Sequence, residues 1–183
     1  MQRSSLPFRL GTTSYIVPDA ILPNVAFLAG RVQDIELVLF ESGDVSNLPG
    51  PAEIEAVNEW RRKADLTYTV HLPLDATLGS ADETARKRGV TQCLRVLELT
   101  RPLEPFARIV HLDGRQRGDR PANDMDDWLR AIERSVGELL KAGYGATDFC
   151  VETLDYPFDL VDPLVRQNGL SVCLDIGHLL MRG

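Results

Sequence analysis

The chain has 183 residues, of which 44% are hydrophobic and 26% charged, values typical of a globular domain with a substantial core. Its net charge of -7 argues against a general nucleic-acid-binding protein, which needs a basic surface. No apolar run reaches the ~18 residues that span a bilayer, and the amino end has no segment of signal-peptide length. We therefore expect a cytoplasmic protein without a membrane partner. Its cysteines lie in apolar segments, which predicts reduced core residues: Cys93, Cys150 and Cys173.

Short apolar segments alternate along the chain with longer segments of helical periodicity. Strands are predicted at 8–13, 34–40, 66–72, 106–112, 147–153 and 170–176. Helices are predicted between them at 19–29, 51–64, 83–99 and 122–142, where apolar residues recur every three or four positions. This alternation indicates a parallel α/β protein with one domain, residues 1–183. An open doubly wound sheet fits the pattern, and so does a (β/α)8 TIM barrel truncated after about six βα units. The sequence lacks a glycine-rich phosphate loop, which removes support for a nucleotide-binding version of the fold.

All three histidines lie at or just beyond the carboxyl end of a predicted strand. His71, His111 and His178 share this position with Glu152 and Asp175. The carboxyl ends of parallel strands form one edge of the molecule, where ligands bind. Mixed imidazole and carboxylate ligands suit zinc, manganese or iron better than calcium or magnesium. The pattern therefore predicts a divalent-metal site formed by these five side chains.

Each of these residues also has a purely structural interpretation. A histidine at a strand end is often a hydrogen-bonded packing residue, Glu152 could cap a helix, and Asp175 could form a turn. Asp113 follows His111 by two residues and could orient it or accept a proton. Arg115 and Arg117 could hold a phosphate, with a solvated loop as the alternative.

Four of these strand ends carry a resemblance to a known family. The segments TVHLPL from 69, IVHLDG from 109, VETLD from 151 and LDIGH from 174 resemble the strand-end motifs of the xylose-isomerase-like TIM-barrel superfamily. That superfamily includes sugar isomerases and epimerases and metal-dependent apurinic endonucleases. The opening segment, FRLGTTSYIVPDAILPNVAFLAGRVQDIELVLFES, together with TYTVHLPLD, is similar to its cobamide-remodelling phosphodiesterases, which cleave a phosphoester in the nucleotide loop of B12-type cofactors.

The resemblance implies roles for individual residues. In the endonuclease-type pattern, the metal-ligand positions are occupied by His71, His111, Glu152, Asp175 and His178. In the isomerase and epimerase pattern, Glu152 is a ligand and the acid/base, Asp175 a ligand, and His178 a substrate contact. Both patterns take further ligands from later strands. The chain resembles the first six strands of an eight-stranded barrel and stops where the sixth helix would begin, so we expect self-association to cover the open edges.

Three functions follow as hypotheses. The first is a metal-dependent phosphodiesterase acting on a small phosphoester, favoured by the presence of both His71 and His111. The second is a divalent-metal-dependent sugar or sugar-phosphate isomerase or epimerase, in which Glu152 moves a proton. The third is a catalytically inactive barrel fragment with a binding role.

Overall fold

The sheet follows the chain from one edge to the other. The structure, a computed structural model, describes residues 6–42, 45–114 and 120–182. In these ranges six strands form one parallel sheet in the order β1-β2-β5-β6-β7-β8. A doubly wound sheet reverses its strand order, whereas the strands of a TIM barrel succeed one another, so the truncated-barrel prediction is confirmed and the doubly wound alternative is wrong. The strands are β1 (Gly11–Thr13), β2 (Asp34–Val38), β5 (Thr67–His71), β6 (Ala107–Val110), β7 (Phe149–Glu152) and β8 (Ser171–Cys173).

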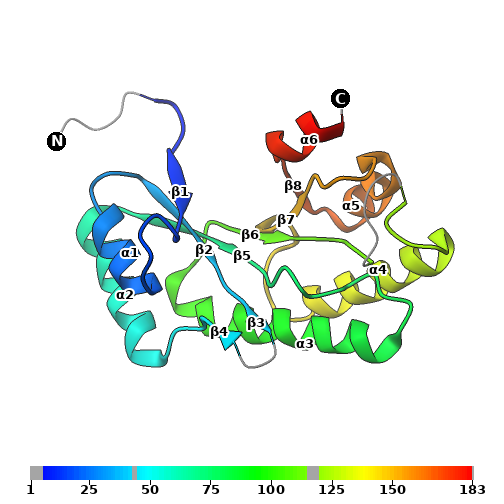
Figure 1. Ribbon diagram of the computed structural model, residues 1–183, viewed down its shortest axis with the longest axis horizontal. Coiled ribbons are helices and arrows are strands. Elements are labelled where there is room, and N and C mark those ends of the chain that lie inside the picture. Colours follow the sequence, from blue (N-terminus) through cyan, green and yellow to red (C-terminus); the bar gives the residue numbers. More distant parts are fainter. Residues whose placement is uncertain (1–5, 43–44, 115–119, 183) are drawn as a thin grey trace.

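Helices connect successive strands and lie along one face of the sheet (Figure 1). The four predicted helices are confirmed, with ends that shift by a few residues. Two shorter helices were not predicted, and neither was the antiparallel pair of β3 (Glu41–Ser42) and β4 (Val45–Ser46). The helices are α1 (Ile21–Leu28), α2 (Pro51–Ala64), α3 (Glu83–Thr100), α4 (Met125–Leu140), α5 (Asp162–Asn168) and α6 (Ile176–Arg182).

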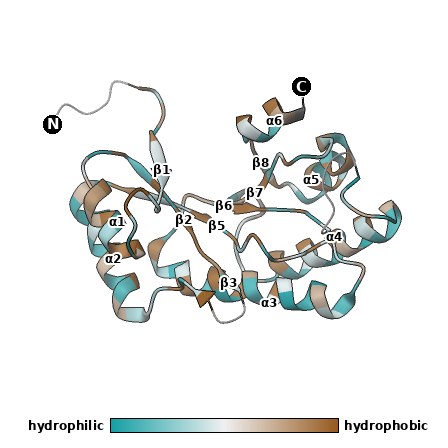
Figure 2. Ribbon diagram, in the orientation of Figure 1, coloured by the Kyte–Doolittle hydropathy of each residue, from teal (hydrophilic) through white to brown (hydrophobic). Residues whose placement is uncertain are grey.

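The two faces of the sheet differ in polarity. On β2, Ile35 and Leu37 are buried under the helices, whereas Asp34 and Glu36 point to the other face and are half-buried. Side chains alternate in this way because successive residues of a strand project to opposite sides. The helices repeat the pattern, with hydrophobic residues turned toward the sheet and hydrophilic ones away from it (Figure 2). The second, concave face is thus polar on β2, whereas on β6 and β8 it also carries apolar side chains such as Ile109 and Val172.

The last strand is shorter than the sequence pattern indicates. The predicted strand at 170–176 ends at Cys173, and α6 begins at Ile176. The cause is Asp175, which caps the helix: its Oδ1 accepts a hydrogen bond from the His178 backbone N–H at 3.1 Å, and its carbonyl accepts one from Leu179 at 3.1 Å. Consequently, His178 lies beyond the end of the strand, in the first turn of α6.

One edge of the sheet carries a group of exposed apolar side chains. They belong to β8 and α6 and to the turn between them: Val172, Leu174, Ile176, Leu179, Leu180 and Met181. In Figure 1 this edge lies opposite β1, at the far side of the strands. Apolar patches of this kind mark contact surfaces. Self-association through this edge stays a prediction.

Two further sequence expectations can be compared with the structure. Cys93 is 1% exposed in the core, as predicted, whereas Cys150 and Cys173 are half-buried; all three are free thiols within the described ranges. None of the helices in those ranges combines the length and hydrophobicity that crossing a membrane requires.

Candidate functional site

Three predicted ligands meet at the carboxyl ends of three adjacent strands. His71 ends β5, Glu152 ends β7, and His111 directly follows β6 between them. The Glu152 Oε2 atom lies 2.8 Å from His111 Nε2 and 3.2 Å from His71 Nε2. The two imidazole rings stand edge to face with their centroids 4.7 Å apart. Ligand atoms around a tetrahedral zinc ion are about 3–3.5 Å apart, so the two distances to Glu152 Oε2 are close to those of a metal site.

The hydrogen bonds of His71 show which of its nitrogens is available. Its Nδ1 lies 2.7 Å from the Leu72 carbonyl oxygen, which can only accept, so Nδ1 carries the proton. In neutral His71, Nε2 is then a lone-pair acceptor that faces the Glu152 carboxylate, which is also an acceptor. A proton or a cation must lie between these two atoms. A backbone carbonyl that fixes the tautomer in this way is the usual support of a metal-ligating histidine.

A second group of possible ligands shares Glu152. Oxygen or nitrogen atoms of Glu152, Asp175 and His178 all lie within 4.8 Å of one another, as do those of His71, His111 and Glu152. The Nδ1 atom of His178 is buried and has no hydrogen-bond partner within the described part of the chain. Because Asp175 uses Oδ1 as the helix cap, Oδ2 faces Nε2 of His178 at 3.8 Å. Glu152 thus belongs to both groups of possible ligands.

The charges at the site follow from these contacts. Burial would raise the pKa of Glu152, but hydrogen bonds from His111 and His71 and their positive charge hold that pKa well below its usual range. Burial lowers the pKa of His71, but its hydrogen bonds to Glu152 and to the Leu72 carbonyl outweigh burial and leave the pKa raised. Glu152 is therefore ionised near neutral pH, which a carboxylate ligand requires.

Glu36 belongs to the surroundings of the site, although it was not among the residues predicted to form it. It lies on the concave face of β2, and burial raises its pKa; the positive charge of His71 opposes this, and the carboxylates of Glu152 and Asp175 add to it. The available signal was its position between the buried Ile35 and Leu37, which assigns it to the opposite face.

The remaining predicted residues are less closely tied to the site. Asp113 is half-buried in the loop after His111, and its carbonyl accepts a hydrogen bond from the Gly79 N–H at 2.8 Å. Its proposed roles, orienting His111 or accepting a proton, stay predictions. Arg115 and Arg117 lie outside the described residues, so the phosphate-binding prediction for them also stays open.

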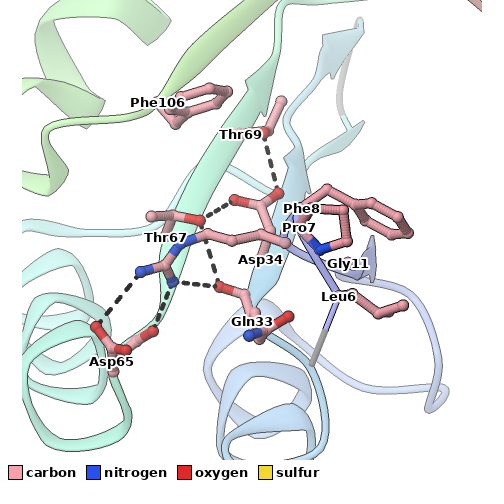
Figure 3. Close-up of a pocket in the computed structure, with 11 residues that line it drawn as sticks. Leu6, Pro7, Phe8, Gly11, Gln33, Asp34, Asp65, Thr67, Thr69 and Phe106 are labelled. Carbon is pink, nitrogen blue, oxygen red and sulfur yellow. Dashed lines mark hydrogen bonds and ion pairs between the residues drawn. The ribbon is translucent and has the colours of Figure 1, made fainter. Parts of the chain in front are cut away.

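A cavity lies at the opposite end of the strands. It measures about 800 Å³ and is lined by residues at the amino ends of β1, β2 and β5. Figure 3 shows its polar side chains joined to one another: Thr67 and Thr69 donate to Asp34 at 2.5 and 3.0 Å, and Arg9 donates to the Asp65 carbonyl at 2.8 Å. Chemistry in barrels occurs at the carboxyl ends of the strands, so we assign the functional site to the ligand groups and not to this cavity.

Comparison with known proteins agrees with this fold. The chain is similar in structure to a D-tagatose 3-epimerase-like protein (19% identity, TM-score 0.74, covering 96% of this chain and 68% of that one). It is also similar to endonuclease IV from Thermus thermophilus (20%, 0.68, 93% and 63%) and to 3-keto-D-glucoside 4-epimerase from E. coli (17%, 0.69, 93% and 69%). The chain thus spans about two thirds of the length of these proteins. No curated protein matches its sequence.

The family comparison covers every residue of both ligand groups. The model of the xylose isomerase-like TIM barrel matches residues 31–183, which include all six strands except β1. Together with the strand order and the position of the ligand groups, this match shows that the chain belongs to the xylose isomerase-like TIM barrel family.

Proposed function

We propose that this protein is a metal-dependent phosphodiesterase that acts on a small phosphoester. The observation that carries the proposal is the shared position of Glu152, which joins the His71–His111 pair to Asp175 and His178. Two ions that share one carboxylate lie close enough to stabilise both the attacking and the leaving oxygen of a phosphoryl group. The net charge of -7 fits a small cofactor or metabolite better than duplex DNA.

The donor set fits divalent ions such as zinc, manganese or iron. Because Nδ1 of His71 bonds to the Leu72 carbonyl, loss of the Nε2 proton would turn an Nε2 lone pair toward the Glu152 carboxylate and make it available to a cation. In the second group, Nε2 of His178 faces Oδ2 of Asp175 at 3.8 Å. Bound ions would supply a hydroxide nucleophile near neutral pH and neutralise charge on the phosphoryl oxygens. The protein itself holds Glu152 ionised between two histidines and keeps the His71 tautomer fixed through Leu72. Asp113, Arg115 and Arg117 are our candidates for contacts to the substrate.

A divalent-metal-dependent sugar isomerase or epimerase is the second candidate. Several of the similar solved structures are epimerases by name, including a D-psicose 3-epimerase and an L-ribulose 3-epimerase, and these names favour the second candidate over the first. In this function Glu152 would bind one ion and move a proton beside a carbonyl group, with Asp175 as a further ligand and His178 in contact with the substrate. His71 and His111 would then only orient Glu152, which is consistent with their hydrogen bonds to it.

Metal content separates the two candidates. Elemental analysis of the purified protein after loading with zinc, manganese or iron should give two ions per chain for the phosphodiesterase and one for the epimerase. His71→Ala and His178→Ala address different ligand groups, so in the two-ion enzyme each should lose about one ion. In the one-ion enzyme His71→Ala should keep its ion.

Activity should follow the metal content. Bis(p-nitrophenyl) phosphate and a B12-type cofactor test phosphodiester cleavage, and a ketohexose series tests epimerisation. Hydrolysis that needs both His71 and His178 supports the first function. Epimerisation that survives His71→Ala would establish the second in its place. A protein that binds no metal and turns over none of these substrates would contradict both and leave a binding role.

A further inference from the structure

Three tyrosine hydroxyls donate hydrogen bonds to backbone carbonyls of distant segments. Tyr68 donates to Val57 at 2.8 Å, Tyr144 to Leu97 at 2.7 Å, and Tyr156 to Leu112 at 2.7 Å. The bonds are chemically alike. Val57 and Leu97 lie within helices α2 and α3, whereas Leu112 directly follows His111, a residue of the first ligand group.

Tyr156 connects the segments that carry two of the ligands. It lies four residues after Glu152, in the loop that follows β7, and its side chain is 3% exposed. Its hydroxyl reaches the loop that follows β6, next to His111. The bond therefore fixes one loop against the other at the point where His111 Nε2 and Glu152 Oε2 approach to 2.8 Å.

A buried tryptophan, Trp128, packs against the Tyr156 ring. The rings of Trp128 and Tyr156 meet edge to face, with centroids 5.4 Å apart, and Trp128 is 1% exposed. Two glycines lie directly against the indole: a Cβ added at Gly79 would lie 2.4 Å from it, and one at Gly114 would lie 2.7 Å from it. No side chain can be accommodated at such a distance, so the ring has little room to move.

The contacts around Trp128 also include the segment that follows His71, the third residue of the first ligand group. Gly79 belongs to the loop between His71 and α3, and its N–H donates to the Asp113 carbonyl at 2.8 Å. The segments that follow His71 and His111 therefore meet at Trp128, and the segment that follows Glu152 reaches Trp128 through Tyr156.

We propose that Tyr156, held in place by Trp128, is a positioning residue that sets the distance between His111 and Glu152. Ligand groups must be held within about 0.5 Å of the productive geometry, and residues behind the ligands provide that precision. The expected effect of Tyr156 on metal affinity rests on the proposed function; its effect on the position of His111 does not. In this proposal Tyr156 acts on the position of His111 indirectly, through its hydrogen bond to the neighbouring Leu112 carbonyl.

The chain provides its own matched controls for the experiment. Tyr156→Phe, Tyr144→Phe and Tyr68→Phe each remove one hydroxyl that donates to a carbonyl, and each should lower the melting temperature of the metal-free protein. We expect only Tyr156→Phe to weaken zinc binding, by roughly tenfold, because disturbing the residues behind ligands typically costs ~10–100-fold in metal affinity. Competition with a chromophoric chelator measures that affinity.

A second readout needs no metal. The sequence contains three histidines, so the ring signals of His111 can be assigned in a proton–carbon NMR spectrum by comparison with a His111→Gln variant. In the metal-free protein, Tyr156→Phe should shift or broaden these signals, and Tyr144→Phe should leave them in place.

The two readouts separate the inference from the proposed function. If the unmodified protein binds no metal, the proposed function fails, and the NMR comparison alone decides whether Tyr156 positions His111. The inference is overturned if Tyr156→Phe leaves the His111 signals unchanged. It is equally overturned if all three variants disturb those signals, or weaken zinc binding, to the same extent, since Tyr156 would then contribute only stability.

Discussion

Replacing Gly79 by alanine should destabilise the protein strongly for so small a change. The added Cβ would lie 2.4 Å from both Cδ1 and Nε1 of Trp128, which is 1.0 Å less than the 3.4 Å at which ordinary contacts begin. It would also lie 2.8 Å from the backbone oxygen of Asp113. Because Trp128 is 1% exposed, the indole cannot turn into solvent to make room. Overpacking of this kind typically costs ~1–3 kcal/mol.

The same substitution at another glycine provides the control. Gly137 lies in α4, and a Cβ added there meets no atom within 4 Å. Alanine is a better helix former than glycine, so Gly137→Ala should stabilise the protein by ~0.5–1 kcal/mol. One chemical change should therefore have opposite effects at two positions of the same chain.

Urea unfolding measures both effects. With a slope of about 2 kcal/mol/M, we expect Gly79→Ala to lower the unfolding midpoint by about 0.5–1.5 M and Gly137→Ala to raise it slightly, with unchanged slopes. Circular dichroism should follow the transition, because the fluorescence of Trp128 is itself perturbed in one variant. A midpoint for Gly79→Ala equal to or above that of the unmodified protein would refute the argument that the Trp128 contacts are rigid.

Three other changes test separate parts of the structure. Asn24→Ala should cost at least ~2 kcal/mol in urea unfolding, because the fully buried Asn24 amide bonds five backbone groups around the start of α1; a neutral result would contradict that role. The hydrogen bond from Arg86 lowers the pKa of Glu83 from 4.5 to about 2, so the stability that it contributes is present above pH 4.5 and lost as the pH falls toward 2. The free energy of unfolding of Glu83→Gln, measured as a function of pH, should therefore fall less steeply between pH 4.5 and 2 than that of the unmodified protein. Equal slopes for the two proteins would show that the Arg86–Glu83 bond contributes no stability. Glu152→Gln should abolish metal binding at both ligand groups in elemental analysis, since both use this carboxylate; retention of one ion would show that the groups are independent.

The sequence alone indicated the parallel α/β class and the strand edge at which the candidate ligands gather, but it left the strand order open between a doubly wound sheet and a barrel. Strand segments such as Ala107–Val110, apolar except for Arg108, are short, and the apolar residues of α4 recur every three or four positions. The alternation of strands and helices is therefore visible in local periodicity. In a parallel sheet, a residue that ends a strand lies at the same edge as every other such residue. His71 and Glu152 could therefore be placed together although 81 residues separate them.

Other features depend on contacts between distant segments, and no local pattern contains them. The end of β8 could not be located because Asp175 looks like a strand-end ligand in sequence but caps α6 in the structure. The Leu72 carbonyl that fixes the His71 tautomer has no side-chain signature. Nothing near Tyr156 indicates that its hydroxyl reaches Leu112, 44 residues away.

The difference between what the sequence determined and what only the structure decided has one physical origin. Backbone periodicity and residue polarity act over a few neighbouring residues, and they determined the alternation of strands and helices and the ligand-type side chains at the strand ends. The close approach of Gly79 and Gly114 to Trp128, and the sharing of Glu152 between two ligand groups, arise only when neighbouring strands from β5 to β8 and the segments that follow them pack together. Such packing joins residues far apart in the chain, and tertiary structure alone decides it.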